Sequence, residues 1–263
     1  MSIYFNPNNG SFTEDKNSQI YVDKTELLKF LNKAVDTPQN CIAVSHSRRF
    51  GKSHAAGMIN AYYSLGSDSS KLFEDTKIAS DPDYEKYRNK YNVIHLDISS
   101  FWDDYKENLT EKIVEYIYDD IKETFGNVLD YKKKLSYVLM KIYKKTEIPF
   151  VIIIDEWDCV IRNSNDQNLI HNYLRFLHSL FKSEESKSFL ALGYITGILP
   201  IKKIEDESTL NNFQEYTMLN SYPITEYYGF TEKEVKDLCE DHAMDFETMK
   251  AWYNGYLIDG MHM

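Results

Sequence analysis

The sequence predicts an α/β protein in which a mainly parallel central sheet is covered by helices on both faces. Three apolar runs, at residues 41–44, 150–154 and 189–197, have the length and the β-branched content of buried strands. Segments with helical periodicity separate these runs along the chain. Because strands that alternate with helices form parallel sheets, a three-layer α/β/α arrangement is expected.

The first part of the chain is expected to supply two helices and two strands. The apolar spacing of residues 26–31 indicates a short amphipathic helix before the strand at 41–44. A second helix is expected over residues 52–63, after the loop that follows this strand. Residues 66–90 are polar and should be mostly loop, whereas the apolar residues of 93–98 predict a second strand.

The second part of the chain continues the alternation of helices and strands. Helical stretches are expected around residues 107–124 and 129–145, before the strand at 150–154. A helix over about 166–183 should follow that strand. Residues 213–219 could form one more strand of the sheet.

A small helical portion is expected at the C-terminal end. Thr231, followed three residues later by Glu234, forms a capping box that predicts the start of a helix. We therefore divide the chain into a main domain of residues 1–225 and a small helical portion of residues 226–263. The second unit would be the start of a lid or of a winged-helix-like region.

Composition predicts an ordered, soluble protein of the cytoplasm. Of the 263 residues, 43% are apolar, so the chain can bury a sizeable core, and the net charge of −11 argues against general nucleic-acid binding. No run approaches the length of a membrane span, and the N-terminus lacks the features of a signal peptide. The three cysteines are widely separated, which fits a reducing compartment.

A phosphate-binding loop is predicted between the first strand and the helix at residues 52–63. Gly51 would let the backbone approach phosphate oxygens, Lys52 would neutralise the β- and γ-phosphates, and the Ser53 hydroxyl could ligate Mg²⁺. His46 stands where the usual Walker A pattern has glycine, so the loop is degenerate. Taken alone, such a loop could be an exposed turn before a helix. The residues expected to contact nucleotide are Arg48, Arg49, Phe50, Gly51, Lys52, Ser53 and His54.

A pair of carboxylates follows the apolar run at residues 150–154. Asp155 would hold Mg²⁺ directly or through water, and Glu156 would polarise the attacking water, as in a Walker B motif on a strand beside the phosphate loop. The alternative is a buried strand whose polar end reaches solvent. The combination with the phosphate loop favours nucleotide binding, with ATP and Mg²⁺ as ligands and with Lys52 and Glu156 as the catalytic residues.

A polar residue near the end of the third apolar run could sense the γ-phosphate. Thr196 ends this run, at the place where such folds set a sensor between the two motifs. The alternative is a hydroxyl that is satisfied by its neighbours. Asp97, at the end of the strand expected at 93–98, is a similar but weaker candidate.

The chain resembles the bacterial AAA-ATPase-like family of P-loop proteins, which is related to archaeal-type ATPases of the signal-transduction group. The resemblance rests on five motifs that occur in the family's order. They are Arg48-Arg49-Phe50-Gly51-Lys52-Ser53, Asp155-Glu156-Trp157-Asp158, Ile195-Thr196-Gly197, the residues from Gly229 to Val235, and Trp252-Tyr253-Asn254-Gly255-Tyr256. The resemblance implies a P-loop NTPase fold and ATP binding.

Two departures from the family bear on function. His46 and Ser47 replace the usual Arg-Pro, which removes a fixed positive charge and a constraint on the loop, so nucleotide affinity could be weaker. Family members usually continue into a nuclease-like domain of the PD-(D/E)XK type, whereas this sequence ends at Met263. The letter matches to that nuclease motif, at 75–77 and 234–236, lack strand context, so no nuclease activity is expected from this chain.

The function predicted from these features is a slow Mg²⁺-dependent ATPase or a nucleotide switch. The alternatives are a nucleotide-gated interaction module and a degenerate remnant with little or no hydrolysis. Arg162 and Arg175 are expected at the surface, so no arginine finger can be assigned and hydrolysis would need self-association or a protein partner. The aromatic segment at 252–256, without a covering domain, would also favour a homo-oligomer.

Overall fold

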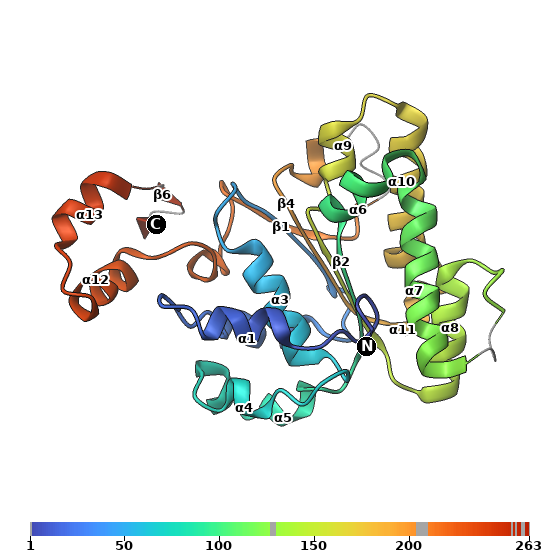
Figure 1. Ribbon diagram of the computed structural model, residues 1–263, viewed down its shortest axis with the longest axis horizontal. Coiled ribbons are helices and arrows are strands. Elements are labelled where there is room, and N and C mark those ends of the chain that lie inside the picture. Colours follow the sequence, from blue (N-terminus) through green and yellow to red (C-terminus); the bar gives the residue numbers. More distant parts are fainter. Residues whose placement is uncertain are drawn as a thin grey trace.

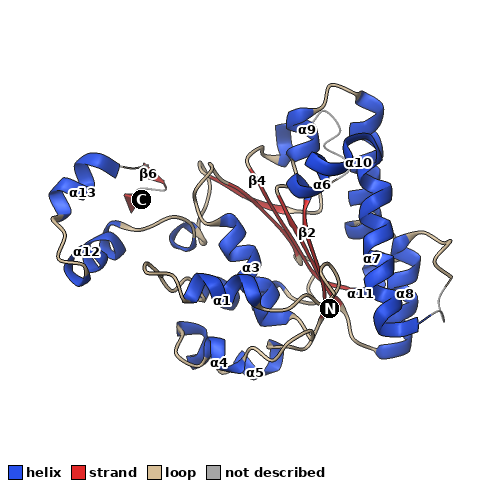
Figure 2. Cartoon of the chain, viewed as in Figure 1, coloured by secondary structure: helices blue, strands red, loops and turns tan. Residues whose placement is uncertain are grey.

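A five-stranded parallel sheet forms the centre of the protein (Figure 1). The computed structural model describes residues 2–126, 130–203, 210–253, 255, 257–258 and 261–262. The strands are β1 (Cys41–Ser45), β2 (Asn92–Asp97), β3 (Phe150–Asp155), β4 (Leu190–Gly197) and β5 (Gln214–Thr217). Figure 2 shows helices on both faces of this sheet. The predicted three-layer α/β/α class is therefore confirmed.

The order of the strands is β2-β3-β4-β1-β5, which corrects one expectation. The acidic strand β3 was expected beside the phosphate-loop strand β1, but β4 lies between them. β4 is buried along its whole length, and an apolar strand of this kind suits the middle of a sheet covered on both faces. Because all the strands are parallel, their carboxyl ends lie at one edge of the sheet, with Asp97 opposite Asp155 and Val44 opposite Thr196.

Alternate residues of the strands pack into two separate cores. In β1, Ile42 and Val44 join the core on one face, whereas Cys41 and Ala43 join the core on the other. The first core is covered by helices α1 (Gly10–Lys16), α2 (Glu26–Ala34) and α3 (Lys52–Tyr63). The second is covered by α6 (Ile98–Tyr105), α7 (Leu109–Phe125), α8 (Leu135–Thr146), α9 (Cys159–Asn163), α10 (Gln167–Phe181) and α11 (Ser186–Phe189).

Two segments differ in detail from what the sequence predicted. The segment 66–90, expected to be mostly loop, also contains three short helical pieces, which are α4 (Ser70–Phe73), the 3₁₀ turn Lys77–Ser80 and α5 (Tyr84–Tyr87). Phe73 and Ile78 anchor these pieces because both side chains are fully buried. The second strand ends at Asp97, because this carboxylate accepts a hydrogen bond from the Ser99 N–H (2.9 Å) and caps helix α6, which was not expected.

The C-terminal elements lie to one side of the sheet (Figure 1). They are α12 (Glu232–Asp241), α13 (Phe246–Tyr253) and a hairpin of β6 (Leu257–Ile258) and β7 (Met261–His262). The predicted capping box is present, since Thr231 and Glu234 bond each other's backbone N–H groups. Lys24 ties this part to the N-terminal segment by donating to both carboxylate oxygens of Glu234, at 2.7 and 2.6 Å.

Three further expectations concern surfaces and cysteines. In the aromatic segment, Trp252 is 79% exposed, while Asn254 and Tyr256 lie outside the described residues. The three cysteines are buried free thiols. Within the described ranges, none of the helices combines the length and the apolar character required to cross a bilayer.

Candidate functional site

The loop between β1 and α3 has the backbone and the cation expected of a phosphate-binding loop. Gly51 has a φ of 75°, a conformation that glycine adopts without strain, and it directly precedes α3. The Lys52 side chain crosses the loop and donates hydrogen bonds to the carbonyls of His46 and Ser47, each at 3.0 Å. Burial lowers the pKa of Lys52, while the nearby carboxylates of Glu156 and Asp155 oppose that shift.

His46, the departure from the Walker A pattern, belongs to the packed core. Its side chain is 1% exposed, and its ring lies 5.1 Å from the Tyr228 ring and 5.8 Å from the Phe50 ring, centroid to centroid. Burial lowers the pKa of His46 to about 4, and the charge of Lys52 adds to this effect. Neither ring nitrogen has a hydrogen-bond partner within the part of the chain that the structure describes.

The segment that packs on His46 also contacts the loop backbone. The Gly229 N–H donates to the Phe50 carbonyl at 3.1 Å, and the Tyr228 hydroxyl lies 2.6 Å from that of Tyr194. From the sequence, His46 was expected only to remove a fixed positive charge near the phosphates. Its position shows instead that the residue joins the loop to the chain that leads into α12.

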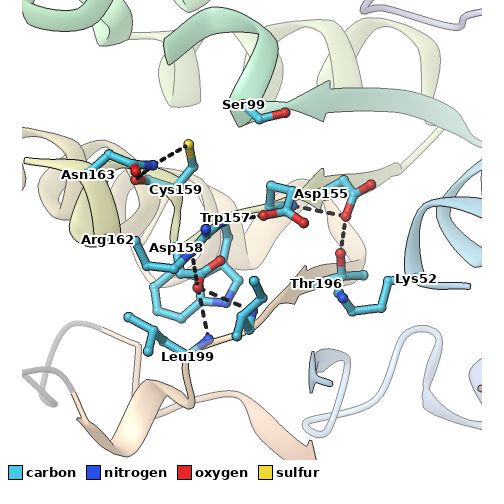
Figure 3. Close-up of polar contacts among 12 residues, drawn as sticks. Lys52, Ser99, Asp155, Trp157, Asp158, Cys159, Arg162, Asn163, Thr196 and Leu199 are labelled. Atoms are coloured by element: carbon cyan, nitrogen blue, oxygen red, sulfur yellow. Dashed lines mark hydrogen bonds and ion pairs between the residues drawn. The ribbon is translucent and has the colours of Figure 1, made fainter. Parts of the chain in front are cut away.

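The Walker B acid and the expected sensor meet at the edge of the sheet. The Thr196 hydroxyl, from the end of β4, donates a hydrogen bond to Asp155, at the end of β3 (Figure 3). The same carboxylate accepts from the Glu156 N–H at 2.9 Å, and the Trp157 N–H bonds the Thr196 carbonyl at 2.9 Å. The structure therefore places Thr196 on β4, between the strands that carry the two motifs, with its hydroxyl on the proposed metal-binding acid.

A second polar group lies near Glu156: Asp158 belongs to the motif Asp155-Glu156-Trp157-Asp158, but no role was predicted for it from the sequence. Asp158 is fully buried, and its Oδ2 accepts from the N–H groups of Ile198 (3.2 Å) and Leu199 (2.8 Å) and from Arg162 Nε (2.8 Å) (Figure 3). Arg162 also forms an ion pair with Glu156.

Arg162 was expected at the surface, and this expectation was wrong. Its side chain is 17% exposed, because α9 turns it back onto Asp158 four residues earlier. The spacing of Asp158 and Arg162 at the start of a helix was the signal that could have revealed this pair. Arg175, on α10, is exposed as expected.

Gly197 lets the ends of β3 and β4 approach closely. A Cβ atom at this position would lie 2.6 Å from Asp158 Oδ1 and 2.7 Å from Trp157 Nε1. Both side chains are fully buried and cannot move aside easily. Glycine is therefore required after Thr196 for the Asp158 contacts to form.

Two cavities meet at the loop. The larger, of about 720 Å³, runs from the phosphate loop to an apolar wall formed by Phe12, Tyr21, Tyr227 and Phe230. The smaller, of about 410 Å³, is lined by polar residues of the acidic edge, including Asp97, Asp155 and Arg162. Arg48, Ser53 and Glu156 line both cavities, so the predicted phosphate and acid residues surround one continuous region.

The remaining predicted residues lie around the same region. Arg48 and Arg49 are exposed, and Arg49 has a φ of 70°. The exposed His54 ring lies on the larger cavity, where its Nδ1 is 2.6 Å from Asp15 Oδ1. The carboxylate of Asp97 is occupied by Ser99 and Ser100, which favours a capping role over a sensor role.

The donor set fits a magnesium ion that also takes ligands from phosphate. Ser53 and Asp155 both line the smaller cavity, and they offer a hydroxyl and a carboxylate oxygen. Mg²⁺ is commonly held by one or two protein oxygens together with phosphate oxygens and water. Among the described residues, no cluster of three or more His, Cys, Asp or Glu side chains could hold a metal ion.

Comparison with known proteins identifies a family. The model of the AAA-ATPase-like family, described as a predicted AAA-ATPase, matches residues 11–205, which is well over half of the chain. No curated protein matches the sequence.

Solved structures with a similar course of the chain include two proteins from other organisms. Cdc6p from Pyrobaculum aerophilum matches with a TM-score of 0.44 and 12% identity over 92% of this chain and 54% of its own. The ORC2 protein of Aeropyrum pernix in its ADP form matches with a TM-score of 0.45 and 12% identity over 92% of this chain and 57% of its own. This chain thus spans a little over half the length of these proteins.

Proposed function

This chain belongs to the AAA-ATPase-like family, and we propose that it binds ATP with Mg²⁺ and hydrolyses it slowly, as an ATPase or a nucleotide switch. One observation carries the proposal. Arg48, Ser53 and Glu156 line both cavities, so a triphosphate on the loop would reach the acidic edge directly.

The phosphate loop would bind the charged end of the nucleotide. Lys52 would exchange its two carbonyl contacts for the β- and γ-phosphates, and the N–H groups at the start of α3 would bond phosphate oxygens. Arg48 and Arg49 would add positive charge from the exposed side of the loop. The base and sugar would then lie along the apolar wall of the larger cavity, beside Phe50 and His54.

The acidic edge would carry out the hydrolytic step. Ser53 and Asp155 would hold Mg²⁺, which neutralises charge on the β- and γ-phosphates. Glu156 would accept a proton from the attacking water, whose oxygen forms a bond to the γ-phosphorus while the bond to the bridging oxygen of ADP breaks. Thr196, through its bond to Asp155, would link the position of the γ-phosphate to β4.

Slow turnover is expected because Arg162, the arginine nearest Glu156, is engaged by two carboxylates. An arginine supplied by a second copy or a partner can add on the order of a thousandfold in rate. The exposed Trp252 is where we expect such self-association.

A second candidate function is a nucleotide-gated interaction module that hydrolyses little. The contacts of Gly229 with Phe50 and of Tyr228 with His46 favour it, because they would let a bound nucleotide influence the C-terminal elements. We assign these elements, residues 226–263, to a small unit distinct from the main domain of residues 1–225.

Calorimetry with ATP, with and without Mg²⁺, tests binding. We expect the wild type to bind and Lys52→Ala to lose binding, whereas Lys145→Ala, an exposed residue of α8, serves as the matched control. Absence of binding by the wild type at millimolar ATP would refute the proposal. Phosphate release that Glu156→Gln abolishes without loss of ATP affinity would identify the ATPase, and binding without release would leave the module.

A further inference from the structure

We propose that Arg162 is a positioning residue that holds the Glu156 carboxylate in its catalytic orientation. This inference rests on the proposed function, because it assigns to Glu156 the task of accepting a proton from water. It concerns an arginine on α9 that the phosphate loop and the Walker B strand do not include.

A hydrogen bond to Asp158 restrains the Arg162 side chain. Its Nε donates to the fully buried Asp158, which is held by the backbone N–H groups of Ile198 and Leu199 just beyond the end of β4. A buried carboxylate with three donors on one oxygen has little freedom to move. The guanidinium is therefore anchored to the same strand end that carries Thr196.

The Glu156 carboxylate requires a contact that restrains its orientation. The Glu156 backbone has a φ of 51°, and its N–H is bonded to Asp155, so the backbone is fixed while the side chain remains 25% exposed. A carboxylate on a partly exposed side chain would otherwise sample several rotamers. The Arg162 ion pair engages Oε2 and leaves Oε1 for the water.

The chemistry of the side chain explains why arginine suits this role. Arg162 uses two different nitrogens, Nε toward Asp158 and a terminal nitrogen toward Glu156. The fixed plane of the guanidinium sets the angle between these two contacts. A lysine at this position has a single nitrogen and would bridge the two acids without fixing their geometry.

Single-turnover phosphate release from Mg²⁺-ATP, normalised to the ATP bound, tests the inference. Arg162→Gln should lower the rate roughly ten- to a hundredfold, the effect expected when a catalytic group is misplaced by about 1 Å. ATP affinity should stay within about threefold, because Arg162 is not a phosphate ligand in this scheme. Arg162→Lys should restore part of the rate, and Arg175→Gln, the matched control on α10, should match the wild type.

Two comparisons separate positioning from a general structural role. In a Glu156→Gln background, Arg162→Gln should cause no further loss, because the group that it positions is already disabled. In the wild type, the Arg162 Nε–H signal in a ¹H–¹⁵N spectrum should be protected from exchange, and Glu156→Gln should shift it. This second measurement needs no Arg162 variant to fold.

The outcomes distinguish this inference from the proposed function. A wild type that releases no phosphate refutes hydrolysis, and with it the positioning of a catalytic carboxylate. A wild type that releases phosphate while Arg162→Gln keeps the full rate overturns the inference alone. A faster Arg162→Gln variant also overturns it, since Arg162 would then restrain Glu156.

Discussion

The two sides of the candidate site are built differently. On the phosphate-loop side, the groups expected to contact phosphate are backbone N–H groups, the buried Lys52 and the exposed cations Arg48 and Arg49. On the acidic side, Asp155 and Asp158 are buried and hydrogen-bonded to β4 and the residues just after it. Changes to the loop should therefore mainly alter nucleotide affinity, whereas changes to the acidic side should alter stability and the rate of hydrolysis.

Asp158→Ala should give the largest effect. The substitution removes the carboxylate that accepts hydrogen bonds from the Ile198 and Leu199 N–H groups and from Arg162. These donors, including most of the charged guanidinium, would then stay buried without an acceptor. Loss of one partner from a buried charged network costs about 3–5 kcal/mol, so the free energy of unfolding should fall by this amount. Chemical denaturation monitored by circular dichroism measures it.

An exposed carboxylate provides the control for this substitution. Glu184→Ala removes an acid whose side chain is 87% exposed, and it should change the free energy of unfolding by less than about 0.5 kcal/mol. If Asp158→Ala cost no more than this control, the acidic side would not be the rigid half of the site.

His46 is a buried titratable group on the loop side, and it should make stability depend on pH. Its pKa is about 4 in the folded protein and 6.5 in its ordinary state, so between these values the unfolded chain binds more protons. The contribution of His46 to the free energy of unfolding should be fully present above pH 6.5 and should be lost as the pH falls toward 4. The difference between the two pKa values corresponds to about 3 kcal/mol.

His46→Phe isolates this contribution. The variant should lose that part of the pH dependence, and at pH 7 it should be more stable by about 1–2 kcal/mol, because it removes two buried ring nitrogens that have no hydrogen-bond partner among the described residues. His95 is half-buried and its pKa is also lowered by desolvation, but it contributes equally to both proteins. Exposed His171→Phe is the control. Equal pH profiles for His46→Phe and the wild type would contradict the assignment.

Thr196→Val tests the contact that joins the acidic side to β4. Valine keeps the shape of threonine and removes the donor to Asp155, so the free energy of unfolding should fall by about 2 kcal/mol. Phosphate release should fall while ATP affinity changes less than threefold. Thr196→Ser should restore both properties. A Thr196→Val variant with wild-type release would make the hydroxyl a structural group only.

Much of the fold could be predicted because it depends on local pattern. The apolar run of β3 and the glycine before α3 specify a strand and a helix start within a few residues. Since the carboxyl ends of parallel strands share one edge, Asp155 and Thr196 could be placed at the same edge of the sheet, but their hydrogen bond was not predicted.

The remaining features depend on contacts between distant segments. The place of β4 between β1 and β3 is a choice of pairing that the strand sequences do not specify. His46 was read as part of the loop alone because its partner, Tyr228, lies far along the chain. Arg162 was placed at the surface because Asp158, which draws it inward, is itself buried by the residues that follow Gly197.

Arg49 offers the smallest effect and the sharpest test of the loop side. Its φ of 70° disfavours any side chain with a Cβ, so Arg49→Gly should keep or raise the free energy of unfolding, by at most about 1 kcal/mol, whereas Arg49→Ala should not. Both variants remove the same charge, and we expect both to lower ATP affinity by the same roughly three- to tenfold, measured by calorimetry. Equal affinity loss with unequal stability would show that charge governs binding on the loop side while the backbone governs folding. If neither variant changed affinity, Arg49 would lie outside the phosphate contacts, and the loop side would depend on Lys52 and the N–H groups of α3.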